Sequence, residues 1–275
     1  MRNLSRFTFL MIFLAGCLPQ NAVPPTPTPS FVASPTVQIR NSEELYGNTA
    51  LGGQNNPTAA ALPNSAGLPP QQIGTAQVGA AQAVEIVLAD SRIVQGDLYL
   101  AGDTLNRVPG VLLLNADRSA WGELPRQVQA AGYTLLLVDS TALATEDLST
   151  LLESLSETGA VDPGRIAVIG AESGADLALL GCTIYPICDA AVLLSPRSQE
   201  TLVNVLPNYN PRPLFVVAAQ SDTEGFSTAA ALARGYANGS QFVEMASGSG
   251  TGLLSLNSNL AGDIIGWLDQ VLSSS

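Results

Sequence analysis

The chain has 275 residues and a formal charge of −12 at pH 7, because 23 acidic residues outnumber 11 basic ones. This balance repels nucleic acid, so we expect no nucleic-acid partner. The chain has no histidine, and every basic residue is an arginine, which excludes chemistry that depends on an imidazole or on a lysine amine.

Residues 1–16 have the pattern of a secretion signal. Two arginines precede an apolar run at 7–14, which is shorter than the roughly 20 residues of a membrane-spanning helix. The sequence Leu-Ala-Gly-Cys that ends at Cys17 resembles the bacterial lipobox, which implies that Cys17 becomes a lipidated first residue. We therefore expect a lipoprotein anchored to a membrane of the bacterial cell envelope, with its domain outside the cytoplasm. The alternative is an ordinary signal peptide in which the cysteine is incidental.

Residues 17–82 are predicted to form a disordered tether after the lipidated cysteine. The segment is rich in Pro, Thr and Gly, and its few large apolar residues have no sustained period. A coil of some 60 residues spans roughly 40–45 Å, which would hold a domain clear of the bilayer. A short ordered piece around Ile39 or Leu45-Tyr46 that docks on the domain is the alternative.

Residues 83–272 form the predicted globular domain, whose length suits one domain. Two β-rich segments joined by residues 89–92 indicate a hairpin. After them, short apolar strands alternate with helices, which is typical of a mostly parallel sheet covered on both faces. Strands are expected at 84–88, 93–100, 111–114, 133–138, 166–169, 190–194, 214–219 and 241–245. Helices are expected at 124–131, from an N-cap at Thr145 to 157, and at 175–180, 226–237 and 259–272.

The central strand, 166–169, runs into a turn of small residues and then a helix. Gly170 and Gly174 let the helix pack tightly on the strand, while the sharp turn lifts the residue between them above the sheet. The turn resembles the Gly-x-Ser-x-Gly turn of the α/β-hydrolases, most closely the dienelactone hydrolase branch. The resemblance implies a three-layer α/β-hydrolase-like sandwich with an N-terminal antiparallel hairpin.

In this register Glu172 takes the nucleophile position. A register shifted by one residue, with Ser173 as nucleophile, is the alternative. The hydrophobic run stops at Gly170, which favours Glu172.

The resemblance assigns three further positions. Asp222 follows strand 214–219, where the family has its catalytic acid. Ser249 stands where the family has its catalytic histidine, and Asn115 stands where a His-Gly pair opens the loop of the oxyanion hole. Asp222 is also a residue type that is common in turns, where it makes local hydrogen bonds.

These substitutions favour a domain that does not catalyse and that acts in binding or as a surface module. A serine hydroxyl needs a neighbouring base to become a nucleophile, and the chain has neither histidine nor lysine. A carboxylate of Glu172 at a helix N-terminus would occupy the place of an oxyanion. The alternatives are an atypical esterase that uses Ser173, an acid–base pair of Glu172 with Asp222, and a cation held by these carboxylates with Asn115 or Ser249.

No glycine loop for a nucleotide and no zinc-ligand spacing occurs in the sequence, so we expect neither a cofactor nor a metal. Cys182 and Cys188 flank a five-residue segment that contains Pro186. In an oxidising compartment a pair at this spacing favours a disulfide, and two buried thiols are the alternative.

Overall fold

The computed structural model describes residues 38–39, 79–102, 106–236 and 240–273. The predicted secretion signal, Cys17 and most of the predicted tether lie outside these residues. Within the described part of the chain, no helix is long and apolar enough to cross a membrane.

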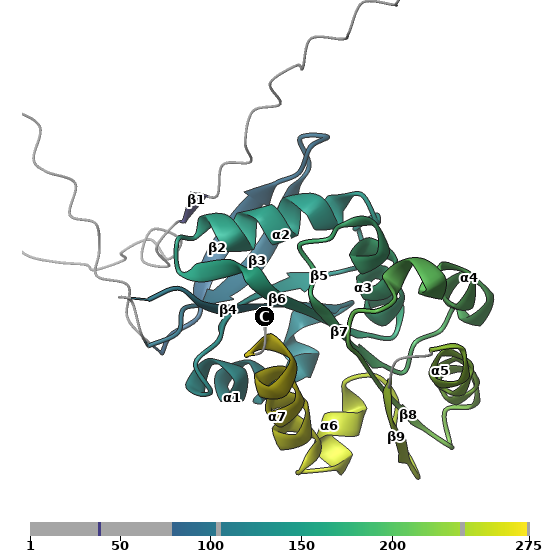
Figure 1. Ribbon diagram of the computed structural model, residues 1–275. Coiled ribbons are helices and arrows are strands. Elements are labelled where there is room, and N and C mark those ends of the chain that lie inside the picture. The colour runs from purple at the N-terminus through teal and green to yellow at the C-terminus, as the bar shows by residue number, and fades with distance from the viewer. Residues whose placement is uncertain (1–37, 40–78, 103–105, 237–239, 274–275) are drawn as a thin grey trace, which may run out of the picture. The chain divides into compact units, whose positions relative to one another are not determined.

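The described residues contain one sheet of nine strands in the order β1-β2-β3-β5-β4-β6-β7-β8-β9 (Figure 1). The pairs β1–β2, β2–β3 and β3–β5 are antiparallel, and all other pairs are parallel. This confirms a mostly parallel sheet with an N-terminal antiparallel hairpin. The strands are β1 (Gln38–Ile39), β2 (Gln82–Val87), β3 (Ile93–Tyr99), β4 (Val108–Asn115), β5 (Thr134–Asp139), β6 (Val161–Ala171), β7 (Ala190–Leu194), β8 (Leu214–Ala219) and β9 (Gln241–Met245).

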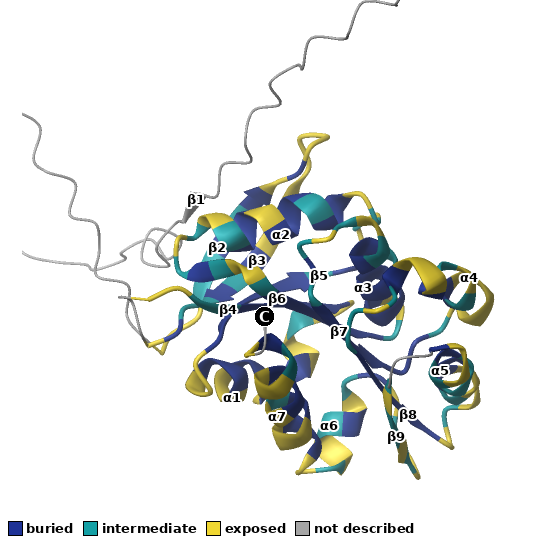
Figure 2. Cartoon of the chain, viewed as in Figure 1, coloured by how far each residue is buried: buried dark blue, intermediate teal, exposed yellow. Residues whose placement is uncertain are grey.

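Helices cover both faces of this sheet, which makes a three-layer sandwich. The leucines of α2 and α3, with apolar residues of α4 and α5, form the core on one face. Trp121, α1, α6 and α7 form the core on the other face, and the strands between the two layers are largely buried (Figure 2). The helices are η2 (Arg118–Trp121), α1 (Leu124–Ala130), α2 (Asp147–Glu157), α3 (Ser173–Ile184), α4 (Gln199–Tyr209), α5 (Thr223–Gly235), α6 (Gly252–Leu256) and α7 (Leu260–Leu272).

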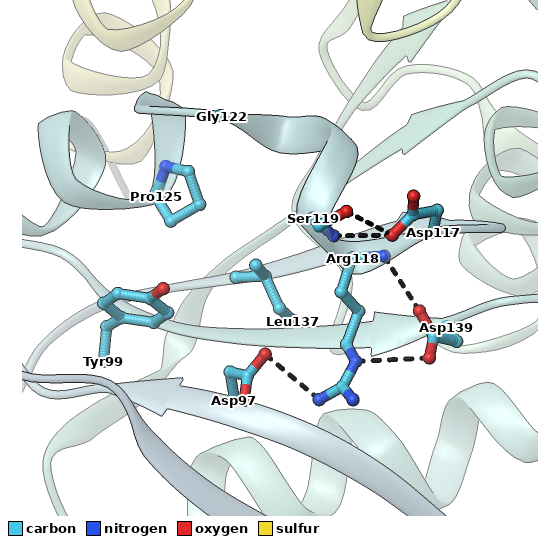
Figure 3. Close-up of a pocket in the computed structure, with 9 residues that line it drawn as sticks. All are labelled: Asp97, Tyr99, Asp117, Arg118, Ser119, Gly122, Pro125, Leu137 and Asp139. Atoms are coloured by element: carbon cyan, nitrogen blue, oxygen red, sulfur yellow. Dashed lines mark hydrogen bonds and ion pairs between the residues drawn. The ribbon is translucent and has the colours of Figure 1, made fainter.

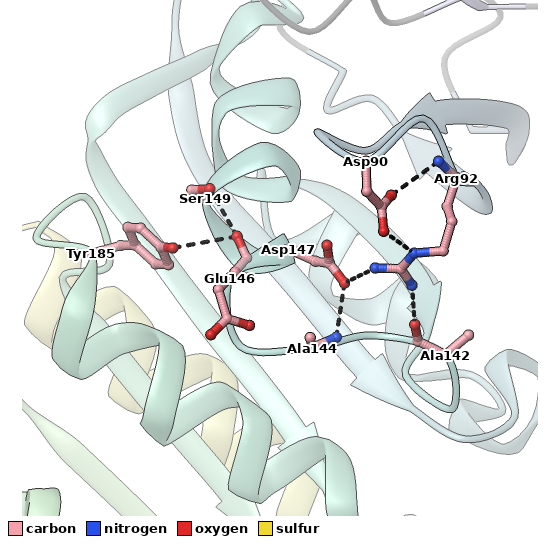
Figure 4. A network of polar contacts seen from close by, with 8 residues as sticks. All are labelled: Asp90, Arg92, Ala142, Ala144, Glu146, Asp147, Ser149 and Tyr185. Carbon is pink, nitrogen blue, oxygen red and sulfur yellow. Dashed lines mark hydrogen bonds and ion pairs between the residues drawn. The ribbon is translucent and has the colours of Figure 1, made fainter.

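The start of α2 differs from the prediction. Glu146 is its N-cap residue and no side chain caps it, so an N-cap at Thr145 is wrong. Asp147 instead accepts a hydrogen bond from the backbone N–H of Ala144 at 2.8 Å. The same carboxylate pairs with Arg92 of the β2–β3 turn at 2.8 Å, so the hairpin is tied to the helix (Figure 4).

Other elements differ from the prediction as well. Helix α5 begins at Thr223 instead of residue 226, because Asp222 accepts a hydrogen bond from the backbone N–H of Gly225 and caps the helix. Strand β6 begins at Val161 instead of residue 166, and residues 162–165 form an irregularity in it, where the register against β4 shifts. Helices α4 and α6 were not predicted, since α4 contains Pro207 and α6 has only five residues.

A disulfide joins Cys182 to Cys188, as predicted. The two Cα atoms lie 5.3 Å apart, and both residues are buried at the end of α3. Arg212 donates a hydrogen bond to the carbonyl oxygen of Cys188 at 2.9 Å, which fixes this loop against the segment before β8.

Candidate functional site

The turn between β6 and α3 places Glu172 above the carboxyl end of the sheet. Glu172 has φ 54° and ψ −119°, a left-handed conformation that is uncommon for a residue with a side chain. A Cβ atom on Gly170 would lie 2.2 Å from the carbonyl oxygen of Gly174. A Cβ atom on Gly174 would lie 2.2 Å from that of Leu114, so the turn needs both glycines.

Ser173 is the first residue of α3 and is exposed. The backbone outlier of this turn is therefore Glu172, and Ser173 already belongs to the helix. This is the geometry of a strand–turn–helix with Glu172 at its tip.

Arg197 lies between the two carboxylates that the sequence assigned to the site. Its Nη2 contacts Oε1 of Glu172 at 2.8 Å, and its Nη1 contacts Oδ1 of Asp222 at 2.5 Å. The Asp222 side chain is 9% exposed, whereas that of Glu172 is 42% exposed. Burial disfavours the charged guanidinium, but hydrogen bonds to the two carboxylates outweigh this effect and raise the pKa of Arg197.

Helix α3 fixes the backbone of Arg197 through a buried carboxylate. Asp176 accepts the backbone N–H of Arg197 at 2.7 Å. It also accepts the N–H and the hydroxyl of Ser198 at 3.0 and 2.6 Å. From α5, the hydroxyl of Thr228 donates to the carbonyl oxygen of Arg197 at 3.1 Å. The backbone of Arg197 is thus held from two helices, and its guanidinium is held by the two ion pairs.

The loop after β9 closes on the same place. Ser195 is fully buried, has φ 53°, and accepts a hydrogen bond from the N–H of Gly250 at 2.9 Å. A Cβ atom on Gly250 would lie 2.8 Å from Cγ of Glu172, so this backbone packs directly on the Glu172 side chain. The loop therefore covers part of the space beside Glu172.

The other two predicted positions do not join this cluster. Ser249 is exposed, and its side chain makes no hydrogen bond within the described residues. Asn115 is buried at the end of β4 and donates from its side chain to the carbonyl oxygen of Asp117 at 3.0 Å. Among the described residues, no group of three or more His, Cys, Asp or Glu side chains could hold a metal ion.

Sequence reasoning missed Arg197. It follows β7, which lies between β6 and β8 in the sheet, so the three charged residues stand at the carboxyl ends of three neighbouring parallel strands. The signal was present as the one basic residue between positions 165 and 212, directly after a predicted strand.

A separate hollow of about 310 Å³ lies between β3, β5 and the segment that contains η2 (Figure 3). Arg118 bridges Asp97 at 3.0 Å and Asp139 at 3.2 Å within it. Burial, reinforced by the charge of Asp97, raises the pKa of Tyr99 on its wall. None of the predicted site residues lines this hollow.

Neither a comparison with protein-family models nor one with curated proteins finds a match to this chain. Solved structures do match. The esterase domain of a Rhodothermus marinus protein is 16% identical, with a TM-score of 0.59 over 69% of this chain and 98% of that one. A 2,6-dihydroxy-pseudo-oxynicotine hydrolase is 14% identical, with a TM-score of 0.61 over 71% of this chain and 69% of that one.

A Pyrococcus furiosus esterase is 15% identical, with a TM-score of 0.57 over 70% of this chain and 93% of that one. The chain has the α/β-hydrolase fold. At these identities the likeness establishes the fold alone. In the α/β-hydrolase fold the turn after the central strand carries the nucleophile, and here that turn carries Glu172.

Proposed function

We propose that this chain is a lipid-anchored protein of the bacterial cell envelope whose α/β-hydrolase domain does not catalyse and acts in binding or as a surface module. One observation supports the absence of catalysis: Arg197 bridges Glu172 and Asp222 at the place where the α/β-hydrolase fold ordinarily has its catalytic residues. A guanidinium stays protonated at any pH at which the protein folds, so it cannot accept a proton from an alcohol or from water.

The ion pairs also argue against the alternative in which Glu172 and Asp222 act as an acid–base pair. Two carboxylates keep one proton between them when their charges repel at close range. Here the guanidinium of Arg197 stands between Glu172 and Asp222 and contacts a carboxylate oxygen of each. This supports a structural role for the cluster.

The anchor in this proposal is Cys17. The charged start, the short apolar run and the Leu-Ala-Gly-Cys sequence support lipidation at this residue and removal of residues 1–16. Cys17→Ser in the producing cell tests it. We expect the chain to incorporate labelled palmitate and to sediment with membranes, and the variant to lose both properties.

An atypical esterase that uses Ser173 is the second candidate. Structural neighbours that are esterases favour it, as does the exposure of Ser173 at the N-terminus of α3. A serine-reactive fluorophosphonate probe separates the two candidates. The proposal predicts no covalent labelling of the native chain above that of the heat-unfolded chain. Labelling that disappears in Ser173→Ala would establish the esterase instead.

A binding role is tested by a ligand screen on the full chain. A compound that binds only the folded state raises the midpoint of thermal unfolding, by mass action. Arg197→Met serves as the companion variant, because a ligand that contacts this cluster loses its effect there and a ligand bound elsewhere keeps it.

A further inference from the structure

The hollow between β3, β5 and η2 is separate from the Glu172 cluster and is large enough for a small ligand. Its volume of about 310 Å³ lies at the lower end of the range for small-molecule sites, roughly 300–1,000 Å³. On β3, Leu98 is buried in the core, while Asp97 and Tyr99 point to the other face, stay partly exposed and line the hollow (Figure 3). Leu137 of β5, the partner of Asp97 in the sheet, adds an apolar side chain to the lining.

Arg118 is held in the hollow with hydrogen-bond donors to spare. Asp139 accepts the backbone N–H of Arg118 at 2.9 Å and its Nε at 3.2 Å. The Nη1 atom contacts Oδ2 of Asp97 at 3.0 Å, so carboxylates on two strands fix the guanidinium. Its Nη2 contacts no acceptor within the described part of the chain, which leaves two N–H donors for a ligand.

Asp117 and Tyr99 supply an acceptor and an apolar surface. Oδ1 of Asp117 accepts the N–H and the hydroxyl of Ser119 at 2.8 and 2.7 Å, while its Oδ2 has no partner among the described residues. The hydroxyl of Tyr99 makes no hydrogen bond to those residues either, and its ring offers an apolar face. The hollow therefore combines free donors, free acceptors and an apolar wall.

The charges of the lining select the class of ligand. Three aspartates and one arginine line the hollow, which leaves two negative charges in excess and repels an anion. A cation would lie beside Arg118, whose guanidinium already occupies Asp97 and Asp139. A neutral ring with several hydroxyls meets neither repulsion, because each hydroxyl can donate to a carboxylate and accept from a guanidinium.

We propose that this hollow binds a neutral sugar ring, either a free monosaccharide or the terminal unit of a longer glycan. The sugar hydroxyls bind Nη2 of Arg118 and the free oxygen of Asp117, and its C–H face packs on the ring of Tyr99. This gives the binding role a site and a ligand class. It rests on neither the lipid anchor nor the absence of catalysis.

Saturation-transfer NMR on the full chain tests the ligand class with the methyl glycosides of glucose, galactose, mannose and N-acetylglucosamine. We expect at least one to bind with a dissociation constant on the order of 1 mM, as is usual for a ligand of about twelve heavy atoms. The amino sugar and the uronic acid of the same ring, which carry a charge, should bind at least fivefold more weakly.

Two results of this titration would overturn the proposal. One is the absence of binding by all four glycosides up to about 50 mM, well above the expected constant. The other is a charged counterpart that binds less than fivefold more weakly than the neutral sugar. A trisaccharide that ends in the bound sugar separates the two sources: tighter binding assigns a glycan, and equal or weaker binding assigns the free sugar.

Tyr99→Ala tests whether the sugar lies in the hollow. Loss of the ring should weaken its binding at least tenfold. Tyr185→Ala is the matched control, since Tyr185 is also partly exposed but lies in the loop that the disulfide closes, and it should leave the affinity unchanged. Equal affinity in both variants and the unchanged chain would overturn the proposal.

A second variant applies if Tyr99→Ala does not fold. Asp117→Asn changes an exposed side chain without changing its shape, and it removes the charged acceptor. We expect at least threefold weaker binding, and an affinity equal to that of the unchanged chain would overturn the proposal. The fluorophosphonate probe reports on Ser173 and not on this hollow, so catalysis and sugar binding are tested independently.

Discussion

Arg197 occupies a position that the sheet itself creates. Glu172, Arg197 and Asp222 follow β6, β7 and β8, which are neighbours in the sheet, so their side chains meet at its carboxyl edge. The positive charge of the guanidinium lies between two negative carboxylates and cancels their charges in part. The cluster leaves a buried carboxylate, Asp222, dependent on a single cation.

Replacing this cation should destabilise the fold. Arg197→Met leaves the buried Asp222 carboxylate without its cation, with the N–H of Gly225 still donating to it, and we expect a loss of about 2–4 kcal/mol in the free energy of unfolding. Most of the loss belongs to Asp222, since the exposed Glu172 regains water. Urea unfolding measures it. Arg126→Met, which breaks the exposed pair with Glu123, is the control and should cost less than about 0.5 kcal/mol. Equal effects of the two variants would contradict a structural role for Arg197.

The glycines of the turn allow a second test at single residues. Gly174→Ala places a methyl group 2.2 Å from the backbone oxygen of Leu114, which cannot move without breaking the sheet. We expect a loss of at least about 2 kcal/mol in unfolding free energy. Gly262→Ala in α7 meets no atom within 4 Å and should instead gain about 0.5–1 kcal/mol. Similar losses for both variants would show that the close contact at Gly174 does not exist.

At this scale the sequence allowed part of the site to be predicted. Spacing around the two glycines, compared with the turn of the α/β-hydrolases that it resembles, pointed to Glu172. The same resemblance pointed to Asp222, through its place after strand 214–219. Arg197 depends on which strands become neighbours, and the carboxylates that bind it are 25 positions away on either side. That information is absent from any short stretch of sequence.

At the scale of elements, the strands were the most predictable feature. Residues 190–194, 214–219 and 241–245 match β7, β8 and β9 at both ends. For β7 and β8 the reason is that an apolar run bounded by polar or turn residues has a clear beginning and end. The helices depend more on tertiary contacts. At the start of α2, Asp147 accepts a hydrogen bond from Arg92, which lies 55 positions earlier in the chain.

The disulfide gives a prediction for α3 and its following loop. It closes a short loop, with a sequence separation of 6, so loop-closure entropy gives it about 2 kcal/mol of stability. The double variant Cys182→Ala/Cys188→Ala should lose about that amount in urea unfolding. Reducing agent should destabilise the unchanged chain equally and leave the double variant unaffected. A reducing agent without effect on the unchanged chain would refute this role.

At the scale of the whole molecule, alkaline pH should unfold the domain through its tyrosines. Burial is the main cause that raises the pKa of Tyr99, Tyr133, Tyr209 and Tyr236, and at Tyr133 the hydrogen bond to Asp269 and the charge of that residue add to it. A group with a raised folded pKa contributes stability that is complete below its unfolded pKa, about 10 for tyrosine, and that is lost as the pH rises toward the folded value.

Since the chain has no lysine, tyrosine dominates side-chain titration near pH 10. We expect the tyrosinate absorbance of these four of the six tyrosines to appear above pH 10 together with the loss of circular dichroism. Titration of these four residues near pH 10, with the circular dichroism unchanged, would contradict the burial described for them.

The central claim is our proposal that the whole domain does not catalyse, because its usual site holds two carboxylates paired with Arg197 and the chain has neither histidine nor lysine. Hydrolysis of a short acyl ester by the purified chain tests it most directly, with Glu172→Ala and Ser173→Ala measured beside it. The predicted rate equals that of buffer in all three proteins. Turnover by the unchanged chain that falls at least tenfold in either variant would contradict the claim.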